Sequence, residues 1–526
     1  MQRRVGVSQP LRNVFSNWGA FLTTAVASFF LTPFVVQSLG NAGYGAWVLL
    51  VALVGYMGLL DLGVRGAVTR FVAQLHARGD HAEASLYAST GLAVLRVSGA
   101  VVLMVGLVAA TLIDNVFWIP PDLVGQARIA VVVSSITIAL ALVNGVYGGI
   151  ITALQRFDLG SGAEILIELL RVLAVVLVLR AGHGLVALAL VQLGCGVVRF
   201  GFAFIVSHRL YPELRFTGSE WTRSHLRQII GFSLASTALQ GAVMLTTQLG
   251  SVVIGAFQPV SMIAFYAIGA TLINYGTSVV AGISYTVPPR VSAQQGRGDM
   301  DAARRTALVG GKLATLVHLP IMITFLLRGE TFIGLWMGPE FAIPSGQILW
   351  ILSLGYWLMA GRQVLGTTMM GLNEHRLFVP FAWVEAGIIV GLSVLLVRTH
   401  GISGVAWATT AAYAVFSAAI YPLLFGRVLK VGVPRIWKEV WLVGNLAMIP
   451  FWLASWGMEK LWAPSSVWVF FLQVAIALPV AIAGAWWLAM TPSDRLPFLS
   501  LLPGRSRTKP AGTPRAKRPV SEAGLR

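Results

Sequence analysis

Long apolar runs limit the folds open to this chain more than any other feature. Most exceed twenty residues, and an α-helix of that length, rising 1.5 Å per residue, crosses the ~30 Å hydrocarbon core of a bilayer. Apolar residues make up 56% of the chain and charged residues 11%, which is less than half the charge of a typical soluble domain. We therefore expect an all-α polytopic membrane protein.

Glycine, proline and clusters of charged residues divide the apolar sequence into about fourteen transmembrane helices. An even number of helices places both termini on the same side of the membrane. The predicted helices span roughly 14–38, 43–70, 88–113, 125–153, 160–181, 184–208, 229–257, 260–287, 306–328, 342–370, 377–398, 402–426, 437–457 and 466–490.

Lysine and arginine gather in alternate connections between these helices. The N-terminus, the connection around Arg290 and the C-terminal tail are rich in them, whereas the intervening connections hold few, such as Arg180 and Arg398. Connections rich in Lys and Arg stay on the cytoplasmic side of a membrane. The distribution of these residues therefore predicts a multi-pass protein of the bacterial inner (cytoplasmic) membrane with both termini cytoplasmic. The net charge of +18 lies mostly in these connections and the tail. Membrane lipids are therefore expected partners, and nucleic acid is not.

The sequence also contains an internal repeat. Residues 178–187 are similar to residues 396–406, and residues 153–157 are similar to residues 371–378, each at an offset of about 218 positions. Helices one to six therefore correspond to helices seven to twelve. Since six is even, the two halves are parallel repeats, which is the plan of a transporter with a central cavity between two lobes.

This repeat divides the chain into four predicted parts. The first lobe is expected over residues 1–210 and the second over 211–430. Helices thirteen and fourteen lie outside the repeat, over 431–490. The tail over 491–526 is rich in Pro, Gly, Arg and Lys, and we expect it to be disordered, basic and cytoplasmic.

Several short motifs resemble those of a known family. They are Leu31–Gly40, Tyr44–Trp47 and Leu60–Gly63 in the first half, with Gly250–Gly255 and Pro288–Arg290 in the second. Over roughly residues 12–430 the chain resembles the polysaccharide/O-antigen flippases of the multidrug/oligosaccharidyl-lipid/polysaccharide (MOP) exporter superfamily.

The resemblance implies a MATE-like arrangement of the lobes and transport by alternating access. The implied cargo is a polyprenyl-diphosphate-linked oligosaccharide, moved from the cytoplasmic to the outer leaflet. Glycan polymerase or assembly proteins are expected as partners, and coupling to an H⁺ or Na⁺ gradient fits the superfamily. A cation-coupled multidrug or metabolite exporter of the MATE type is the alternative; it would need a compact acidic cation site and a mostly apolar pocket.

Ionisable side chains at membrane depth are costly and therefore mark functional sites. We expect them to line the cavity, with the arginines holding phosphate or an anionic sugar through their planar, bidentate guanidinium groups. Structural pairing, for example of Glu168 with Arg171, or snorkelling of Arg96 is the alternative interpretation. The candidates for substrate binding are Arg171, Arg199, Arg362, Glu168, Glu385, Arg96 and Glu164.

Other polar residues are less specific. Asp61 and Arg65, one turn apart in the second predicted helix, are interpreted as a gate or as a structural pair. Gln240, Gln248 and Asn274 are suited either to sugar hydroxyls or to contacts between helices.

Catalytic machinery is not visible in the sequence. It contains no GxxxxGK[ST] phosphate loop, no HExxH motif and a single cysteine, so we expect no enzyme activity, no cofactor and no metal site. A third interpretation, a membrane enzyme of glycan assembly, is disfavoured because the outer connections are all short.

Overall fold

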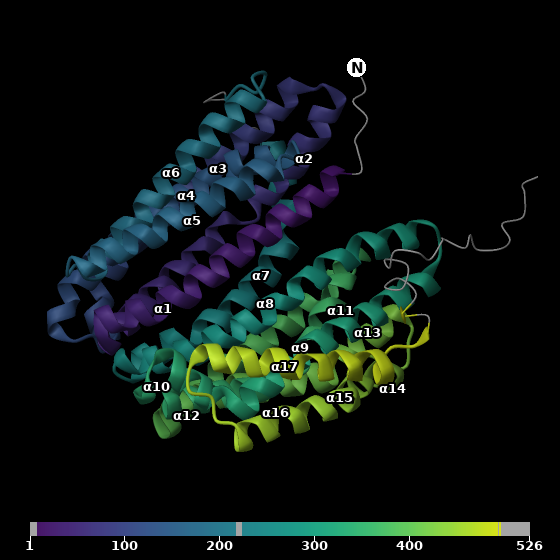
Figure 1. Ribbon diagram of the computed structural model, residues 1–526. Coiled ribbons are helices and arrows are strands. Elements are labelled where there is room, and N and C mark those ends of the chain that lie inside the picture. The colour runs from purple at the N-terminus through teal and green to yellow at the C-terminus, as the bar shows by residue number, and fades with distance from the viewer. Residues whose placement is uncertain (1–7, 217–222, 493, 496–526) are drawn as a thin grey trace, which may run out of the picture.

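The computed structural model describes residues 8–216, 223–492 and 494–495, and every regular element in these ranges is a helix. Figure 1 shows how these helices are arranged. In chain order they are α1 (Ser8–Met57), η1 (Gly58–Asp61), α2 (Val64–Arg78), α3 (His81–Val116), α4 (Pro121–Ala153), α5 (Phe157–Arg180), α6 (Leu185–Leu210), α7 (Arg223–Phe257), α8 (Ser261–Gly296), α9 (Met300–Met337), α10 (Pro339–Tyr356), α11 (Met359–Gly371), η2 (His375–Phe378), α12 (Val379–Val415), η3 (Phe416–Ile420), α13 (Tyr421–Leu429), α14 (Val433–Ile436), η4 (Trp437–Leu442), α15 (Val443–Ala447), α16 (Ile449–Leu461), α17 (Val467–Gly484) and η5 (Ala485–Ala489).

These segments form fourteen membrane spans. Ten helical stretches are long and apolar enough to cross a bilayer. Two of them, Thr23–Arg78 and His375–Leu429, each contain two spans, because the chain reverses at Gly40 (φ 67°) and at Gly401 (φ 58°). The α10–α11 pair, bent by 47°, supplies one more span, and the more highly charged α5 supplies the last. The predicted fold class is confirmed.

The helix ends repeat in the same way as the sequence. Asp80 and Asp299 are the N-cap residues of α3 and α9, and each side chain accepts a backbone hydrogen bond at the third residue beyond it. Gln155 (φ 56°) and Asn373 (φ 61°) follow α4 and α11 in the left-handed conformation. The members of each pair lie about 218 positions apart, as the parallel repeat requires.

The repeats form two bundles (Figure 1). Helices α1–α6 make up the first bundle, and α8–α17 make up the second. Helix α7 connects them: near its start Gln228 accepts a hydrogen bond from Tyr87 of α3 at 2.6 Å, whereas its later part packs along α12. Its start therefore contacts the first bundle, although the sequence alone assigned all of α7 to the second lobe.

The bundles pack against each other at one end only. One apolar core takes residues from both of them, such as Val36 of α1, Ile268 of α8 and Ile348 of α10. Towards the other end each bundle has its own separate core, around Val68 in the first and Val364 in the second. In Figure 1 the bundles accordingly meet at the left and diverge to the right, where α1 begins.

Close contacts fix the end at which the bundles meet. The rings of Phe29 and Trp336 stack with centroids 5.0 Å apart, and the indole N–H of Trp336 donates to the Phe29 carbonyl at 3.0 Å. A Cβ on Gly45 would lie only 1.8 Å from the carbonyl oxygen of Val260. Backbones of α1 and α8 can approach this closely only because residue 45 is glycine.

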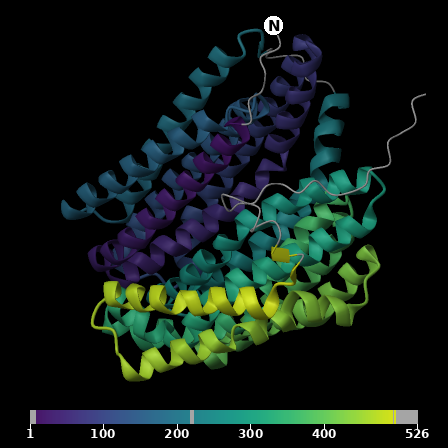
Figure 2. The ribbon, with the colours of Figure 1, turned by 45° about the vertical axis from the view of Figure 1, so that its right-hand side comes forward.

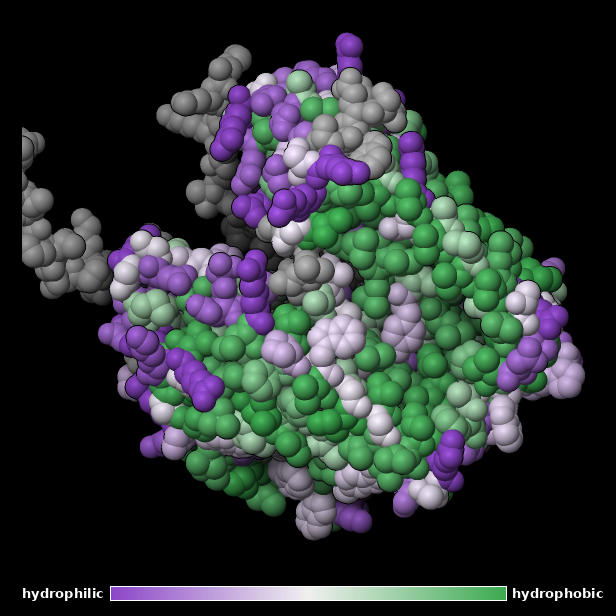
Figure 3. Space-filling view, turned by 180° about the vertical axis from the view of Figure 1, so that it is seen from behind, coloured by the Kyte–Doolittle hydropathy of each residue, from purple (hydrophilic) through white to green (hydrophobic). Residues whose placement is uncertain are grey.

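The outer surface matches a membrane environment. Hydrophobic residues cover most of the face in Figure 3, and hydrophilic residues gather along its margins. In water such an apolar surface would mark an interface, whereas here hydrocarbon is its solvent.

Two local predictions need correction. The second predicted helix, over 43–70, is interrupted: η1 ends at Asp61, and Leu62 and Gly63 are left-handed before α2 begins. The tail, expected to be disordered from position 491, is ordered at its start, since Asp494 pairs with Lys312 of α9 at 2.6 Å. Residues 496–526 lie outside the described part of the chain.

Candidate functional site

A cavity of about 530 Å³ lies in the second bundle, between α7, α8, α11, α12 and α13. It extends from the shared core to the bundle's separate core, since Tyr413 belongs both to its wall and to the shared core, and Phe378 and Phe425 belong both to its wall and to the separate core. Its volume falls within the range of small-molecule sites. The polar part of the lining consists of Gln240, Thr246, Thr247, Asn274, Thr277, Ser278, Gln363, Thr367, His375, Arg362, Glu385 and four tyrosines.

Arg362 and Glu385 form a buried ion pair in this wall. Their side chains are 13% and 3% exposed, and two parallel hydrogen bonds of 2.7 and 2.6 Å join guanidinium to carboxylate. Tyr421 donates to the same carboxylate at 3.0 Å, and its ring lies 4.0 Å from the guanidinium carbon. The two parallel hydrogen bonds and the face of the Tyr421 ring together stabilise the buried charges of Arg362 and Glu385.

Two more arginine–glutamate pairs lie in the first bundle. Within α5, Arg171 binds Glu168 through hydrogen bonds of 2.9 and 2.6 Å. Arg199 of α6 binds Glu164 of α5 at 2.9 and 2.7 Å, and these two side chains are 42% and 50% exposed. The pairing of Glu168 with Arg171 matches the structural alternative considered from the sequence.

The helical phase of α5 shows which way these charges point. Leu166, Leu170, Leu173 and Leu177 are the exposed apolar side of the helix, repeating at i, i+4, i+7 and i+11. The two glutamates and Arg171 follow the same spacing two residues earlier, which places them on the opposite side. Glu168 and Arg171 therefore point away from the lipid-facing side, towards the interior of the first bundle, whereas Glu164, on the same side of α5, is half exposed.

The remaining candidates lie elsewhere. Arg96 is exposed on α3. The Asp61 carboxylate accepts hydrogen bonds from the backbone N–H groups of Gly63 and Arg65. Asp61 therefore holds the start of α2 in place, and its contact with Arg65 runs through the backbone.

Glycine in α4 lets this helix pack closely against the start of α2. A Cβ at Gly149 would lie 3.1 Å from the Thr69 hydroxyl oxygen and 3.3 Å from the Arg65 carbonyl oxygen, closer than an ordinary van der Waals contact. Such tight packing suits a structural role, the second of the two interpretations made from the sequence.

Sequence reasoning missed two further ionic contacts. Arg328, at the end of the helix predicted over 306–328, is 1% exposed in α9 and binds Glu459 of α16 at 2.8 Å and Gln473 of α17. Lys312, also in α9, binds Asp494. Their partners are more than 130 positions away, so no local pattern could reveal them. Both contacts attach the last two spans to α9.

Metal-binding geometry was not found in the described part of the chain: no three His, Cys, Asp or Glu side chains come together there. Cys195 is partly buried on α6.

In the cavity of the second bundle both carboxylate oxygens of Glu385 are already bound to Arg362. This cavity can therefore offer hydrogen bonds from amides and hydroxyls, and one guanidinium, which is paired with Glu385.

Comparisons with known proteins agree with this architecture. A model of the family described as "Polysaccharide biosynthesis protein" matches residues 11–295, and the MatE family model matches residues 240–395. The chain is 21% identical to the "Putative O-antigen transporter" of Shigella flexneri, over 75% of this chain and 92% of that protein. It is 23% identical to the "Uncharacterized membrane protein EpsK" of Bacillus subtilis (strain 168), over 63% of this chain and 66% of that protein.

Solved structures share the fold. An inward-facing multidrug resistance MATE family transporter of the MOP superfamily is similar with a TM-score of 0.68 and 16% identity, covering 78% of this chain and 96% of that one. The lipid II flippase MurJ, in an inward closed conformation, is similar with a TM-score of 0.66 and 13% identity, covering 88% of this chain and 98% of that one.

Proposed function

Since the chain belongs to the polysaccharide biosynthesis protein family of the MOP exporter superfamily, we propose that it carries a polyprenyl-diphosphate-linked oligosaccharide from the cytoplasmic to the outer leaflet. The observation that carries the proposal is the cavity of the second bundle. Its uncharged amides and hydroxyls match sugar hydroxyls, and the buried guanidinium of Arg362 matches an oxyanion.

The packing of the bundles supports transport by alternating access. Both bundles share a core at one end and have separate cores towards the other. With the termini on the cytoplasmic side, the separated end faces the cytoplasm, and the contact of Phe29 with Trp336 closes the outer side. Opening to the outside then requires this contact to break while the cytoplasmic ends close.

The three arginine–glutamate pairs supply exchangeable anion sites in this proposal. An unpaired charge in a membrane interior is costly, so the glutamates hold Arg171, Arg199 and Arg362 in place while no substrate is bound. A phosphate or sugar carboxylate then takes over the bidentate contact from the glutamate.

The cavity is poorly suited to the alternative, a cation-coupled multidrug exporter. Glu385 is the carboxylate in its lining, and both of its oxygens are bound by Arg362. A drug cation or a coupling cation would have to displace this guanidinium.

A deletion strain tests the proposal. It should lose glycan from the cell surface and accumulate the lipid-linked intermediate in the cytoplasmic leaflet, and a plasmid copy should restore both. Drug susceptibility, measured in the same strain, should stay unchanged. Normal glycan display in the deletion strain would refute the proposal, and hypersensitivity to cationic drugs would favour the multidrug exporter.

A further inference from the structure

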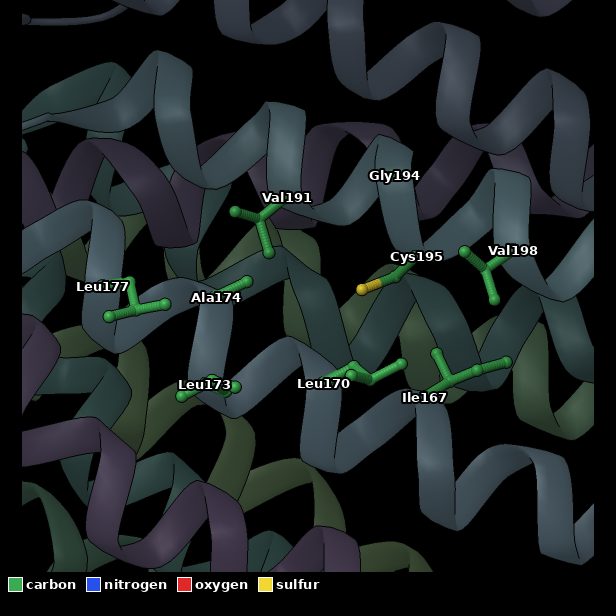
Figure 4. A pocket seen from close by; sticks show the side chains of 9 residues that line it. All are labelled: Ile167, Leu170, Leu173, Ala174, Leu177, Val191, Gly194, Cys195 and Val198. Atoms are coloured by element: carbon green, nitrogen blue, oxygen red, sulfur yellow. The ribbon is translucent and has the colours of Figure 1, made fainter.

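Two apolar grooves flank α5. One, of about 560 Å³, lies between α1 and α5 and is lined by residues such as Thr23, Ala27, Leu169, Val172 and Val176. The other, of about 330 Å³, lies between α5 and α6, where Ala174 and Cys195 lie in its wall (Figure 4). We propose that, of these two grooves, the α1–α5 groove holds the hydrocarbon chain of the lipid-linked substrate. This inference rests on the proposed function.

The α1–α5 groove leads from the lipid-facing side of α5 to its charged side. Leu169, at its lipid-facing edge, is 54% exposed. Val172, also in its wall, follows Arg171 directly and lies one turn beyond Glu168. A lipid with its chain in this groove would therefore have its phosphates beside the Glu168–Arg171 pair.

The dimensions of the groove suit a long chain. On α1 its wall runs from Thr23 to Phe34, about 16 Å along the helix axis, or half the thickness of the hydrocarbon core. The α1 residues in the wall recur at i, i+4 and i+8, as Thr23, Ala27 and Leu31, so they form one continuous strip. An isoprenoid chain lying along this strip would stay within a single leaflet.

The groove borders the junction between the bundles. Phe30, in its wall, lies 6.3 Å from Trp468 of α17, measured between ring centroids, and the two rings are 55% and 69% exposed. Both grooves are lined by helices of the first bundle alone. Of the two, the α1–α5 groove is the one whose wall contacts the second bundle, through Phe30 and Trp468, so alternating access would move a chain bound there relative to α17.

A matched pair of substitutions tests the inference. Ala27→Trp fills the α1–α5 groove, and Ala174→Trp fills the α5–α6 groove on the other side of the same helix. Measured in the complemented deletion strain at equal protein levels, Ala27→Trp should lower glycan export at least tenfold, while Ala174→Trp should stay within twofold of wild type. Equal export by the two variants would overturn the inference.

Photocrosslinking supplies a measurement that does not depend on export. The full-length protein in nanodiscs is exposed to a polyprenyl diphosphate that carries a diazirine in its chain, and labelled residues are located by mass spectrometry. Label should appear on 23–34 of α1 at least fivefold more often than on 191–198 of α6. Unlabelled polyprenyl diphosphate should compete, and phosphatidylglycerol should not. Equal labelling of the two segments, or equal competition by phosphatidylglycerol, would overturn the inference.

The failures of the two proposals can be told apart. If the wild-type gene fails to restore glycan display, the proposed function is wrong, whatever the grooves bind. If wild type restores display and Ala27→Trp does so equally well, the function stands and the groove assignment is wrong.

Discussion

At the residue scale, the dominant pattern is that three arginines within the membrane spans are each paired with a glutamate. Arg171, Arg199 and Arg362 each make two parallel hydrogen bonds to one carboxylate. Sequence reasoning could identify these residues, because an ionisable group inside an apolar run is costly. It could not identify the partner of Arg199 or of Arg362, since each partner lies on a different helix.

Breaking the Arg362–Glu385 pair should destabilise the protein. Glu385→Gln leaves the guanidinium buried without its counter-ion, which should lower the free energy of unfolding by about 3–5 kcal/mol. The double variant Arg362→Met/Glu385→Leu should recover most of this loss. The measurement is denaturant unfolding of the purified protein in detergent.

An exposed pair provides the control for this prediction. Arg435 and Glu439 lie 2.7 Å apart with side chains 61% and 35% exposed, so Glu439→Gln should cost less than about 1 kcal/mol. If Glu385→Gln costs no more than this control, Arg362 is not held in the way the geometry indicates.

At the element scale, the last two spans are attached to α9 by buried ionic contacts. Arg328 reaches Glu459 on α16 and Gln473 on α17, and its guanidinium lies 4.6 Å from the centre of the Phe470 ring. Lys312 makes the corresponding contact near the other end, with Asp494. These spans have no counterpart in the six-helix repeat, and these contacts make them part of the second bundle.

Removing the first of these contacts should loosen α16 and α17. Arg328→Met leaves Glu459 without its cation, so backbone hydrogen exchange should accelerate in Ile449–Leu461 and Val467–Gly484, as seen by mass spectrometry. Helix α5 should be unaffected. Lys460→Met, a change at an exposed residue next to Glu459, is the control. Unchanged exchange in both helices would show that Arg328 does not hold them.

At the scale of the whole molecule, two bundles joined at one end provide a cavity and a way to change its access. The two separate cores let each bundle keep its shape while the contact between bundles changes. Helix α7, which contacts the first bundle at its start and α12 along its later part, is the element that must accommodate this movement.

The orientation in the membrane can be tested with reporter fusions. A green fluorescent protein fused after Arg526 should fluoresce, because a cytoplasmic C-terminus lets it fold. Alkaline phosphatase fused after Gly182, in the connection between α5 and α6, should be active. The same enzyme fused after Arg156, on the other side of α5, should be inactive. The reverse pattern of phosphatase activity would invert the predicted topology.

The sequence by itself determined the number of spans, their parity and the repeat. These follow from local properties: the length of apolar runs, the positions of positive charges and the recurrence of short motifs. Even the left-handed residues Gln155 and Asn373 recur as the repeat predicts. The break before α2 was missed because Leu62 and Gly63 fall inside the window predicted as one helix, 43–70, and the flanking charges Asp61 and Arg65 were interpreted as a gate or a structural pair.

Only the tertiary structure decided which charges meet, which grooves exist and where the bundles touch. The partners of Arg199 and Arg328 are 35 and 131 positions away in the sequence. The grooves beside α5 depend on how closely α1 and α6 approach it. In lipid every apolar surface is equally well solvated, so the hydropathy of a helix does not reveal its neighbours. Shape and a few buried charges select those neighbours, and both are properties of the folded chain.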